Sequence, residues 1–321
     1  MPFLKKRSLL LAKVEVTEGV DPVPAPATDA LLVSNPNVKP TGELLVRDFD
    51  RASLSPLPHV IGLKEVEVTF ATELKGSGTA NVGGAGDIPE IDPLLQACGF
   101  AVTLTAESPP ASGNGFIEYD PASDNLKTIT LYVYLDGILH KISGCRGSFS
   151  FNAEAGKFGT FEWTFKGLYT QPTDAAIPGG AVFNNQTPPP FLNANLALAG
   201  YAAIVQAFTF DMANDIQRRE NANSAEGVIG FVLGGRDTQG SINPEAVSEA
   251  THPFWADWKN AVQKAFSATF GSVAGAKIDI TAPKVQAREM TWGDRNTVRT
   301  YEIPMTLAQN AGDDEVKLKF Y

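Results

Sequence analysis

Strict alternation of apolar and polar residues is the feature that most limits what this chain can fold into. Residues 64–70 (KEVEVTF) place Val66, Val68 and Phe70 on one face, opposite two glutamates and a threonine. The segments TITLYVYL (128–135) and FEWTF (161–165) follow the same period of two. Successive side chains of a β-strand point to opposite faces, so this pattern is typical of strands with one buried face. The chain is therefore predicted to be mainly β, with antiparallel sheets.

Turn signals between the alternating segments predict a series of hairpins over residues 128–169. The dipeptide Asp136-Gly137 is a tight-turn signal that separates LYVYL from ILHKI. A second turn signal, EAGK at residues 154–157, separates SFSFN from FGTFEWTF. This spacing predicts a meander of four antiparallel strands.

Two segments carry helix signals. Residues 92–99 (DPLLQACG) begin with an aspartate suited to capping, continue with proline at the first helical position and end at glycine. The segment after Pro253 carries an apolar stripe with helical spacing, formed by Phe254, Trp258, Ala261, Val262 and Ala265. The sequence therefore predicts a short helix at 92–99 and a longer one, within 253–268, that lies across a sheet.

The chain changes composition between its two halves. Residues 170–191 hold five prolines and no periodicity, which is typical of a linker or a long loop. Strand-like runs resume after it, at residues 206–211, 227–232, 277–281, 299–307 and 316–321. At 321 residues the chain is long enough for two domains. We expect two related β domains, residues 1–175 and residues 176–321, the second containing the helix at 253–268.

Charge and composition exclude several classes of protein. The net charge is −10, divided as −6 over residues 1–170 and −4 over the rest, so neither half offers the basic surface that grips nucleic acid. No apolar run approaches the length of a membrane-spanning helix, and the run 9–12 is too short for a secretion signal. With only Cys98 and Cys145, a disulfide framework is not expected. We expect a protein made in a cytoplasm, without membrane association.

No motif in the sequence argues for catalysis or for a bound cofactor. The glycine-rich segment 76–84 lacks the third glycine of a dinucleotide fingerprint and the Gly-Lys-Ser/Thr of a phosphate loop. The three histidines lie far apart, and neither cysteine belongs to a CxxC pair, so no metal site is expected. Candidate acid and base residues occur only in polar loops, at Asp48, Asp50 and His59 and at residues 313–315. We therefore expect neither an enzyme nor a cofactor-binding protein.

Three long polar segments, 36–58, 76–89 and 211–226, are interpreted as loops longer than a compact monomer usually needs. Antiparallel sheets also leave exposed edges, which tend to aggregate unless they are covered or closed into a barrel. Completion of the sheets by neighbouring subunits would account for both the long polar segments and the exposed edges. The sequence thus indicates a structural oligomer.

Several segments together resemble the major tail proteins of bacteriophages, which are the tail-tube subunits of long-tailed phages. The resemblance begins with LLLAKVEVTEGVDPVPAPATDALLVSN and continues through GLKEVEVTFATELKGSG and IDPLLQACGF. It is strongest over residues 8–169, which include TLYVYLDGILHKISGCRGSFSFNAEAGKFGTFEWTFKGLY. In the second half it rests on NSAEGVIGFVLGGRDTQGSI and on the DDEVKLKFY ending, whereas residues 170–200 have no counterpart in the family.

The resemblance implies an antiparallel β-sandwich or barrel with short flanking helices, and subunits that form rings stacking into a hollow tube. Family members with one tube domain form rings of six chains, and longer members with two tube domains form rings of three with pseudo-sixfold symmetry. The length of this chain and its two β-rich halves favour the second arrangement over the first. The implied partners are further copies of the chain, the tape-measure protein, the tail terminator, distal tail proteins, and DNA passing through the lumen without tight binding. The implied location is the virion tail, after synthesis in the cytoplasm of a bacterial host.

Within such a tube, two charged segments are the candidates for contacts between stacked rings: the loop Arg47, Asp48, Phe49, Asp50 and Arg51, and a turn at Arg218 and Arg219. Both place charges where complementary rings could dock. Other virion proteins, such as distal-tail or decoration subunits, remain an alternative, as does a carbohydrate-binding or hydrolytic β-sandwich. The last class usually displays a platform of surface aromatics, whereas the four tryptophans here are expected at core-like or isolated positions.

Overall fold

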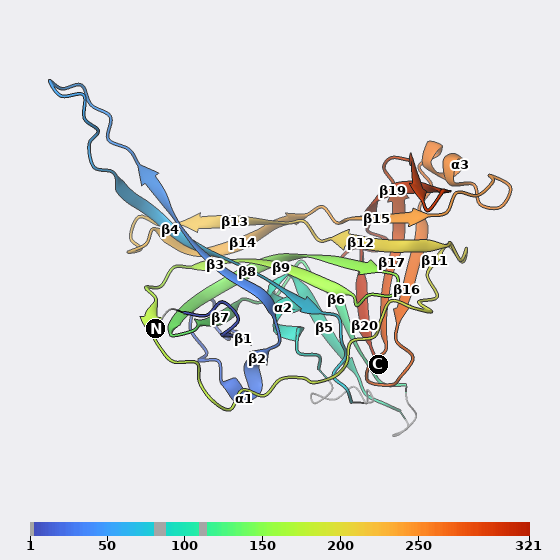
Figure 1. The fold of residues 1–321 in the computed structure, drawn as a ribbon, viewed down its shortest axis with the longest axis horizontal. Coiled ribbons are helices and arrows are strands. Elements are labelled where there is room, and N and C mark those ends of the chain that lie inside the picture. Colours follow the sequence, from blue (N-terminus) through green and yellow to red (C-terminus); the bar gives the residue numbers. More distant parts are fainter. Residues whose placement is uncertain (1–2, 80–87, 109–113) are drawn as a thin grey trace.

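A computed structural model describes residues 3–79, 88–108 and 114–321 of the chain. Antiparallel strands dominate it, with three short helices at Pro26–Asp29 (α1), Asp92–Ala97 (α2) and Phe254–Lys259 (α3) (Figure 1). The expected mainly-β fold is confirmed. Within the described residues, no helix is both long and apolar enough to cross a bilayer.

One continuous row of eight paired strands runs across the molecule. Its order is β3 (Ser34–Leu45), β4 (Val60–Glu73), β9 (Thr160–Leu168), β8 (Ile138–Glu154), β12 (Val205–Asp211), β15 (Gln239–Pro244), β19 (Val298–Ala308) and β17 (Ile278–Ala287). The pairing of β8 with β12 joins the two halves of the chain directly by main-chain hydrogen bonds. The row is therefore uninterrupted between its first and last strands.

Two groups of further strands extend from the long strands β8 and β17. The first half of β8 pairs into a group with β7 (Ile129–Leu135), β1 (Ser8–Val14), β2 (Ala30–Leu31) and β10 (Thr173–Asp174). The first half of β17 pairs into a group with β16 (Lys264–Phe270), β11 (Ala197–Leu198), β20 (Lys317–Phe320), β6 (Phe116–Pro121) and β5 (Phe100–Thr105). Each long strand thus belongs to the eight-strand row and to a second group.

The meander expected over residues 128–169 contains three strands, not four. Both predicted turns are present, one between β7 and β8 and one between β8 and β9. However, the two runs expected on either side of residue 144 form the single strand β8. Gly144 adopts φ +63° there, next to a register shift against β7, so the chain bends at this glycine without reversing.

Alternation in the strands builds the core. The inward side chains of β8, β9 and β12 form an aromatic cluster that continues from one half of the chain into the other; it contains Phe149, Phe151, Phe161, Trp163, Phe165, Phe208 and Phe210. Their rings lie in close contact, for example Phe151 and Phe210 at 5.3 Å between centroids. Each such side chain contributes about 1.5–3 kcal/mol on burial, so this cluster is a major source of stability.

Both helices near the predicted positions are shorter than the sequence indicated. In α2, Asp92 lies inside the helix, and its carboxylate accepts hydrogen bonds from Tyr119 and Gln96, so it is not the cap. The helix expected over 253–268 ends at Lys259, and residues from Lys264 onward form β16. Ala261 adopts φ +53°, which no helix continues, and pairing with β17 buries alternate residues of β16. Tertiary pairing therefore overrides the helical stripe.

Two of the three expected loops contain strands. Residues 36–58 include most of β3, and residues 211–226 include β13 (Asn214–Glu220), which pairs with β14 (Val228–Arg236) as a separate hairpin. A further short strand, β18 (Thr291–Arg295), pairs with β19. Most of the expected loop 76–89, together with most of the glycine-rich segment, lies outside the described residues. Residues 170–191 run largely without regular structure, in keeping with the expected linker.

Candidate assembly surfaces

The hairpin of β3 and β4 continues beyond the body of the molecule as a projecting arm (residues 41–63; Figure 1). Its tip holds Arg47, Asp48, Phe49, Asp50 and Arg51, all of them exposed. The structure therefore places the first set of predicted contact residues together at the end of the arm, away from the body of the molecule. His59 lies on the same arm, and Asp48, Asp50 and His59 are all in contact with solvent, which is no environment for acid–base catalysis.

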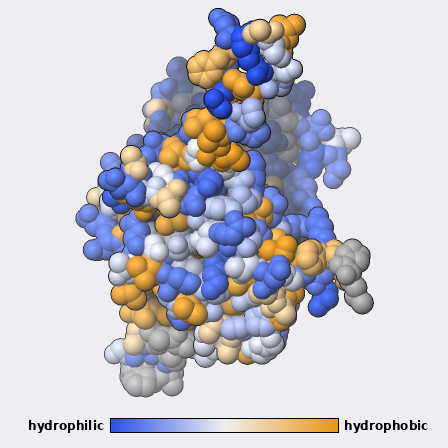
Figure 2. Space-filling view, turned by 90° about the vertical axis from the view of Figure 1, so that its left-hand side faces the viewer, coloured by the Kyte–Doolittle hydropathy of each residue, from blue (hydrophilic) through white to orange (hydrophobic). Residues whose placement is uncertain are grey.

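Apolar side chains are unusually exposed along this arm. Phe49 is 67 % exposed, and the other exposed apolar residues are Leu44, Leu45, Val46, Leu54, Val60 and Ile61. Figure 2, which looks onto this end of the molecule, shows hydrophobic and hydrophilic residues mixed on the projecting part. A gathering of exposed apolar residues bordered by charges is characteristic of a surface that another protein covers. The arm tip is thus the leading candidate for a protein contact.

The second set of predicted contact residues does not lie in a turn. Arg218 and Arg219 belong to strand β13, where extended backbone pairs them with β14. Arg218 approaches Glu220 at 2.7 Å and Glu65 of β4 at 3.8 Å, and its hydrogen bond with Glu220 raises its pKa. Arg219 lies 3.8 Å from Glu18. The contacts with Glu65 and Glu18 hold the hairpin against the body of the same chain, whereas Glu220 lies on the same strand as Arg218; both arginines retain exposed surface.

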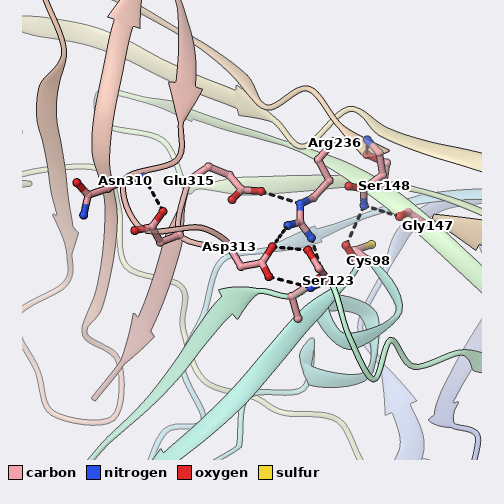
Figure 3. Close-up of polar contacts among 11 residues, drawn as sticks. Cys98, Ser123, Gly147, Ser148, Arg236, Asn310, Asp313 and Glu315 are labelled. Carbon is pink, nitrogen blue, oxygen red and sulfur yellow. Dashed lines mark hydrogen bonds and ion pairs between the residues drawn. The ribbon is translucent and has the colours of Figure 1, made fainter. Parts of the chain in front are cut away.

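Arg236 ties the base of the β13–β14 hairpin to both halves of the chain (Figure 3). Its guanidinium lies 2.5 Å from Asp313 and 2.7 Å from Glu315, and it donates a hydrogen bond to the Ala122 carbonyl at 2.6 Å. Partial burial alone would raise the pKa of Asp313, but hydrogen bonds from Ser123 and Arg236 hold it below its usual value. A hollow of about 500 Å³ opens beside this cluster.

Asn214 fixes the same base from the other strand of the hairpin. Its side-chain amide donates to the carbonyls of Cys98 and Gly147, at 2.8 and 2.9 Å. Its backbone N–H donates to the Ser148 hydroxyl at 3.1 Å. Sequence reasoning missed both Asn214 and Arg236, because their partners lie 66 to 116 residues away along the chain. In the sequence, Asn214 falls in a segment interpreted as a loop and Arg236 lies beyond the strand-like run 227–232, so neither stood out.

The face of the eight-strand row opposite the aromatic cluster is polar. Two shallow hollows of about 380 and 300 Å³ cross it, and their polar lining includes Ser148, Ser150, Asn152, Glu162, Thr209 and Asp211. The charged members Glu162 and Asp211 are acidic and exposed. This polar face (the side chains just named) can repel phosphate groups and stay wet, but it offers no cationic cluster to hold a polyanion.

Among the described residues, no group of three His, Cys, Asp or Glu side chains could hold a metal ion. Cys98 and Cys145 are free thiols, and burial raises the pKa of each, so both behave as inert core residues. The tryptophans differ from expectation. Trp163 lies in the core, but Trp255, Trp258 and Trp292 gather beside Tyr301 around α3, with Trp258 and Trp292 exposed.

A search of curated proteins found no match. A family model described as phage tail tube protein matches residues 5–318, which is nearly the whole chain. That family is structural and is not a family of enzymes. With its mainly-β fold and a match over this length, the chain belongs to the phage tail tube protein family.

Proposed function

We propose that this chain is the subunit of a phage tail tube, in which rings of three chains stack into a hollow conduit for DNA. The observation that carries the proposal is a repeated strand order within the eight-strand row. The first four strands are β3, β4, β9 and β8, and the next four are β12, β15, β19 and β17. In both sets the chain visits the positions in the order first, second, fourth, third.

The repeat extends beyond the row. In each set a long hairpin comes first, namely β3–β4 and then β12–β15 with its continuation β13–β14. A short helix follows, α2 or α3. The strand that pairs with the long strand β8 or β17 comes next, directly as β16 in the second set and after the additional strands β5 and β6 as β7 in the first. This parallel supports two tube-type units, residues 1–175 and 176–321. Three such chains supply six units, which is the basis for rings of three with pseudo-sixfold symmetry.

Stacking of one ring on the next is assigned to the arm tip, residues 47–51. Contacts that stack rings run head to tail and propagate without closing, so each ring must present a projecting surface and a receiving one. The exposed Phe49 supplies apolar area, and the flanking Arg47 and Arg51 supply charge for orientation. Arg218 and Arg219 on the second hairpin are proposed as a lesser contact, because part of their charge is already paired within the chain.

The lumen is assigned to the polar face of the row. A conduit for DNA must repel phosphates enough to prevent binding, and exposed Glu162 and Asp211 on a hydroxyl-rich surface meet that need. The family places the protein in the virion tail. The proposed partners are the tape-measure protein, the tail terminator and distal tail proteins. The proposed place of synthesis is the cytoplasm of the bacterial host.

The arm gives the sharpest test of this function. Replacement of Phe49 and Arg51 together by alanine should abolish tubes but leave rings and the fold intact, because both side chains are exposed and away from the core. Negative-stain electron microscopy over a series of concentrations measures both outcomes. The matched control replaces Val182 and Lys157, an exposed apolar and an exposed basic residue away from the arm, and should form normal tubes. A wild-type chain that forms neither rings nor tubes at any concentration would contradict the proposal.

A further inference from the structure

We propose that neighbouring chains in a ring join by pairing strand β18 of one copy with strand β3 of the next. This junction repeats, between chains, the β8–β12 junction that joins the two halves within one chain. The inference rests on the proposed function and names the surfaces through which a ring closes. Its partner is therefore a second copy of this chain.

The internal junction shows what such a joint looks like. Phe151 of β8 pairs with Phe210 of β12, and their rings pack at 5.3 Å on the core side. At the two ends of the pairing, the Met212 N–H donates to the Phe149 carbonyl at 3.0 Å and the Ala155 N–H donates to the Gln206 carbonyl at 2.8 Å. In the repeated order, this joint connects the fourth strand of one set, β8, to the first strand of the next, β12.

The same two positions are open at the margins of the row. In the described part of the chain, β3 pairs with β4 alone, and β18, which extends the course of β17 along β19, pairs with β19 alone. One open margin is thus a first strand, β3, and the other continues a fourth strand, β17. Figure 1 shows them on opposite sides of the molecule, with β3 leading into the arm and β18 close to α3. A joint of the internal type between copies would fill both margins at once.

The strand registers identify which residues at the open margins correspond to the paired residues of the internal joint. Glu73 pairs with Thr160 at the end of the first set, and Glu245 bridges Thr300 at the corresponding place in the second. Counting one residue on from these two pairs, Tyr301 corresponds to Phe161. Trp292 pairs with Tyr301 as Phe151 pairs with Phe161, so Trp292 corresponds to Phe151.

The same count applied to the second strands makes Gly240 of β15 correspond to Val68 of β4, because each lies five residues before its reference glutamate. Phe210 pairs with Gly240 and Val38 pairs with Val68, so Val38 corresponds to Phe210. Since Phe151 pairs with Phe210 inside the chain, Trp292 pairs with Val38 between chains. Thr291 then lies opposite Lys39.

Side chains at the two margins fit this assignment. Trp292 is 54 % exposed although it lies on the core side of its strand, 5.0 Å from the Tyr301 ring and 5.7 Å from Trp255. A tryptophan in this position is apolar surface that the neighbouring copy can bury against half-buried Val38. Pro36 and Pro40 flank Val38 on β3 and lack an N–H, so they limit pairing along this edge and confine the joint to the short stretch around Val38.

Paired cysteines test the joint in the full-length chain. Thr291→Cys combined with Lys39→Cys places two exposed, outward-facing thiols opposite each other, whereas native Cys98 and Cys145 are buried. After oxidation, non-reducing gel electrophoresis should show covalent dimers and trimers, with more than half of the chains cross-linked and nothing above the trimer. The control Thr291→Cys with Glu43→Cys, four residues further along β3, should cross-link at least fivefold less.

Electron microscopy of the same samples separates this inference from the function on which it rests. Rings or tubes whose chains cross-link no more than the control would overturn the β18–β3 joint and leave the tube function standing. Absence of rings and tubes in all samples, wild type included, would overturn both. As a second variant, Trp292→Ala should keep the monomer's circular dichroism and weaken ring formation at least tenfold in concentration; unchanged assembly would count against the joint.

Discussion

Buried polar groups show at the residue scale how distant parts of this chain fit together. The Glu15 carboxylate accepts hydrogen bonds from the hydroxyls of Thr128 and Thr130, at 2.7 and 2.6 Å, and from the backbone N–H groups of Gly19 and Gly144, both at 2.7 Å. A carboxylate satisfied by four donors can remain buried. Nothing in the alternating sequence around Glu15 indicates this, because three of the four donors lie more than 110 residues away.

His252 yields a prediction about pH. Its ring is buried, stacks on Tyr201 at 4.3 Å and lies 3.2 Å from the Lys264 ammonium, with the carboxylate of Asp257 close by. Burial first, and then the charge of Lys264, lower the pKa of His252 from 6.5. The folded chain therefore favours the neutral ring. Stability is complete above about pH 6.5 and is lost as the pH falls, because the unfolded chain then binds a proton that the folded chain resists.

The urea midpoint of the wild-type chain should accordingly fall between about pH 7.5 and pH 5, and that of His252→Gln should fall less. Some dependence will remain, because burial lowers the pKa of His140 as well. His59 is exposed on the arm, so His59→Gln serves as the control. Its urea midpoint should change with pH as that of the wild type does. Equal slopes for all three proteins would refute the assignment to His252.

At the scale of elements, period-two patterns were reliable and helical patterns were not. Val66, Val68 and Phe70 are buried on one face of β4 as the alternation predicts. The stripe after Pro253 satisfied the helical period just as well, yet β16 begins at Lys264 because pairing with β17 buries Phe266 and its alternate neighbours. Short apolar segments fit both periods, and the partner strand decides between them.

The base of the β13–β14 hairpin gives a prediction at this scale. Arg236→Ala leaves Glu315 and the Ala122 carbonyl without their donor and should destabilise the chain by about 3 kcal/mol, in line with loss of one partner from a buried ion pair. Urea unfolding measures this cost, and hydrogen exchange across 214–236 should become faster. Lys157→Ala, which removes an exposed ion pair with Glu154, is the control and should change stability by less than about 0.5 kcal/mol. Unchanged exchange in the hairpin would show that Arg236 does not hold it.

At the scale of the whole molecule, the uninterrupted row of strands gives the chain two distinct faces. The inner face carries the aromatic cluster, and the polar face is open to solvent around the hollows lined by Ser150, Glu162 and Asp211. Because β8 and β12 pair directly, the two halves present these faces side by side. A row with one core face and one polar face is the arrangement a tube wall requires.

The proposed lumen leads to a prediction for whole particles. Phage carrying Glu162→Lys and Asp211→Lys should still form tubes, since both side chains are exposed, but should release DNA more slowly and less completely because lysine attracts phosphate. Triggered DNA release from purified particles, followed by fluorescence, measures the effect. Asp174→Lys on β10 makes the same kind of charge change away from the polar face and serves as control. Normal release from the double variant would remove these residues from the lumen.

The sequence by itself determined the strands with clear alternation, such as β4, β7 and β9, the two turns of the meander, the acidic balance and the family. These properties depend on neighbouring residues or on sums over the chain, which a sequence displays directly. Only the tertiary structure decided that residues 138–154 form one bent strand, that Arg218 and Arg219 lie in a strand, and that Trp292 is exposed at an open margin. Each of these depends on how strands pair and pack in three dimensions, which the residues of a single strand do not show.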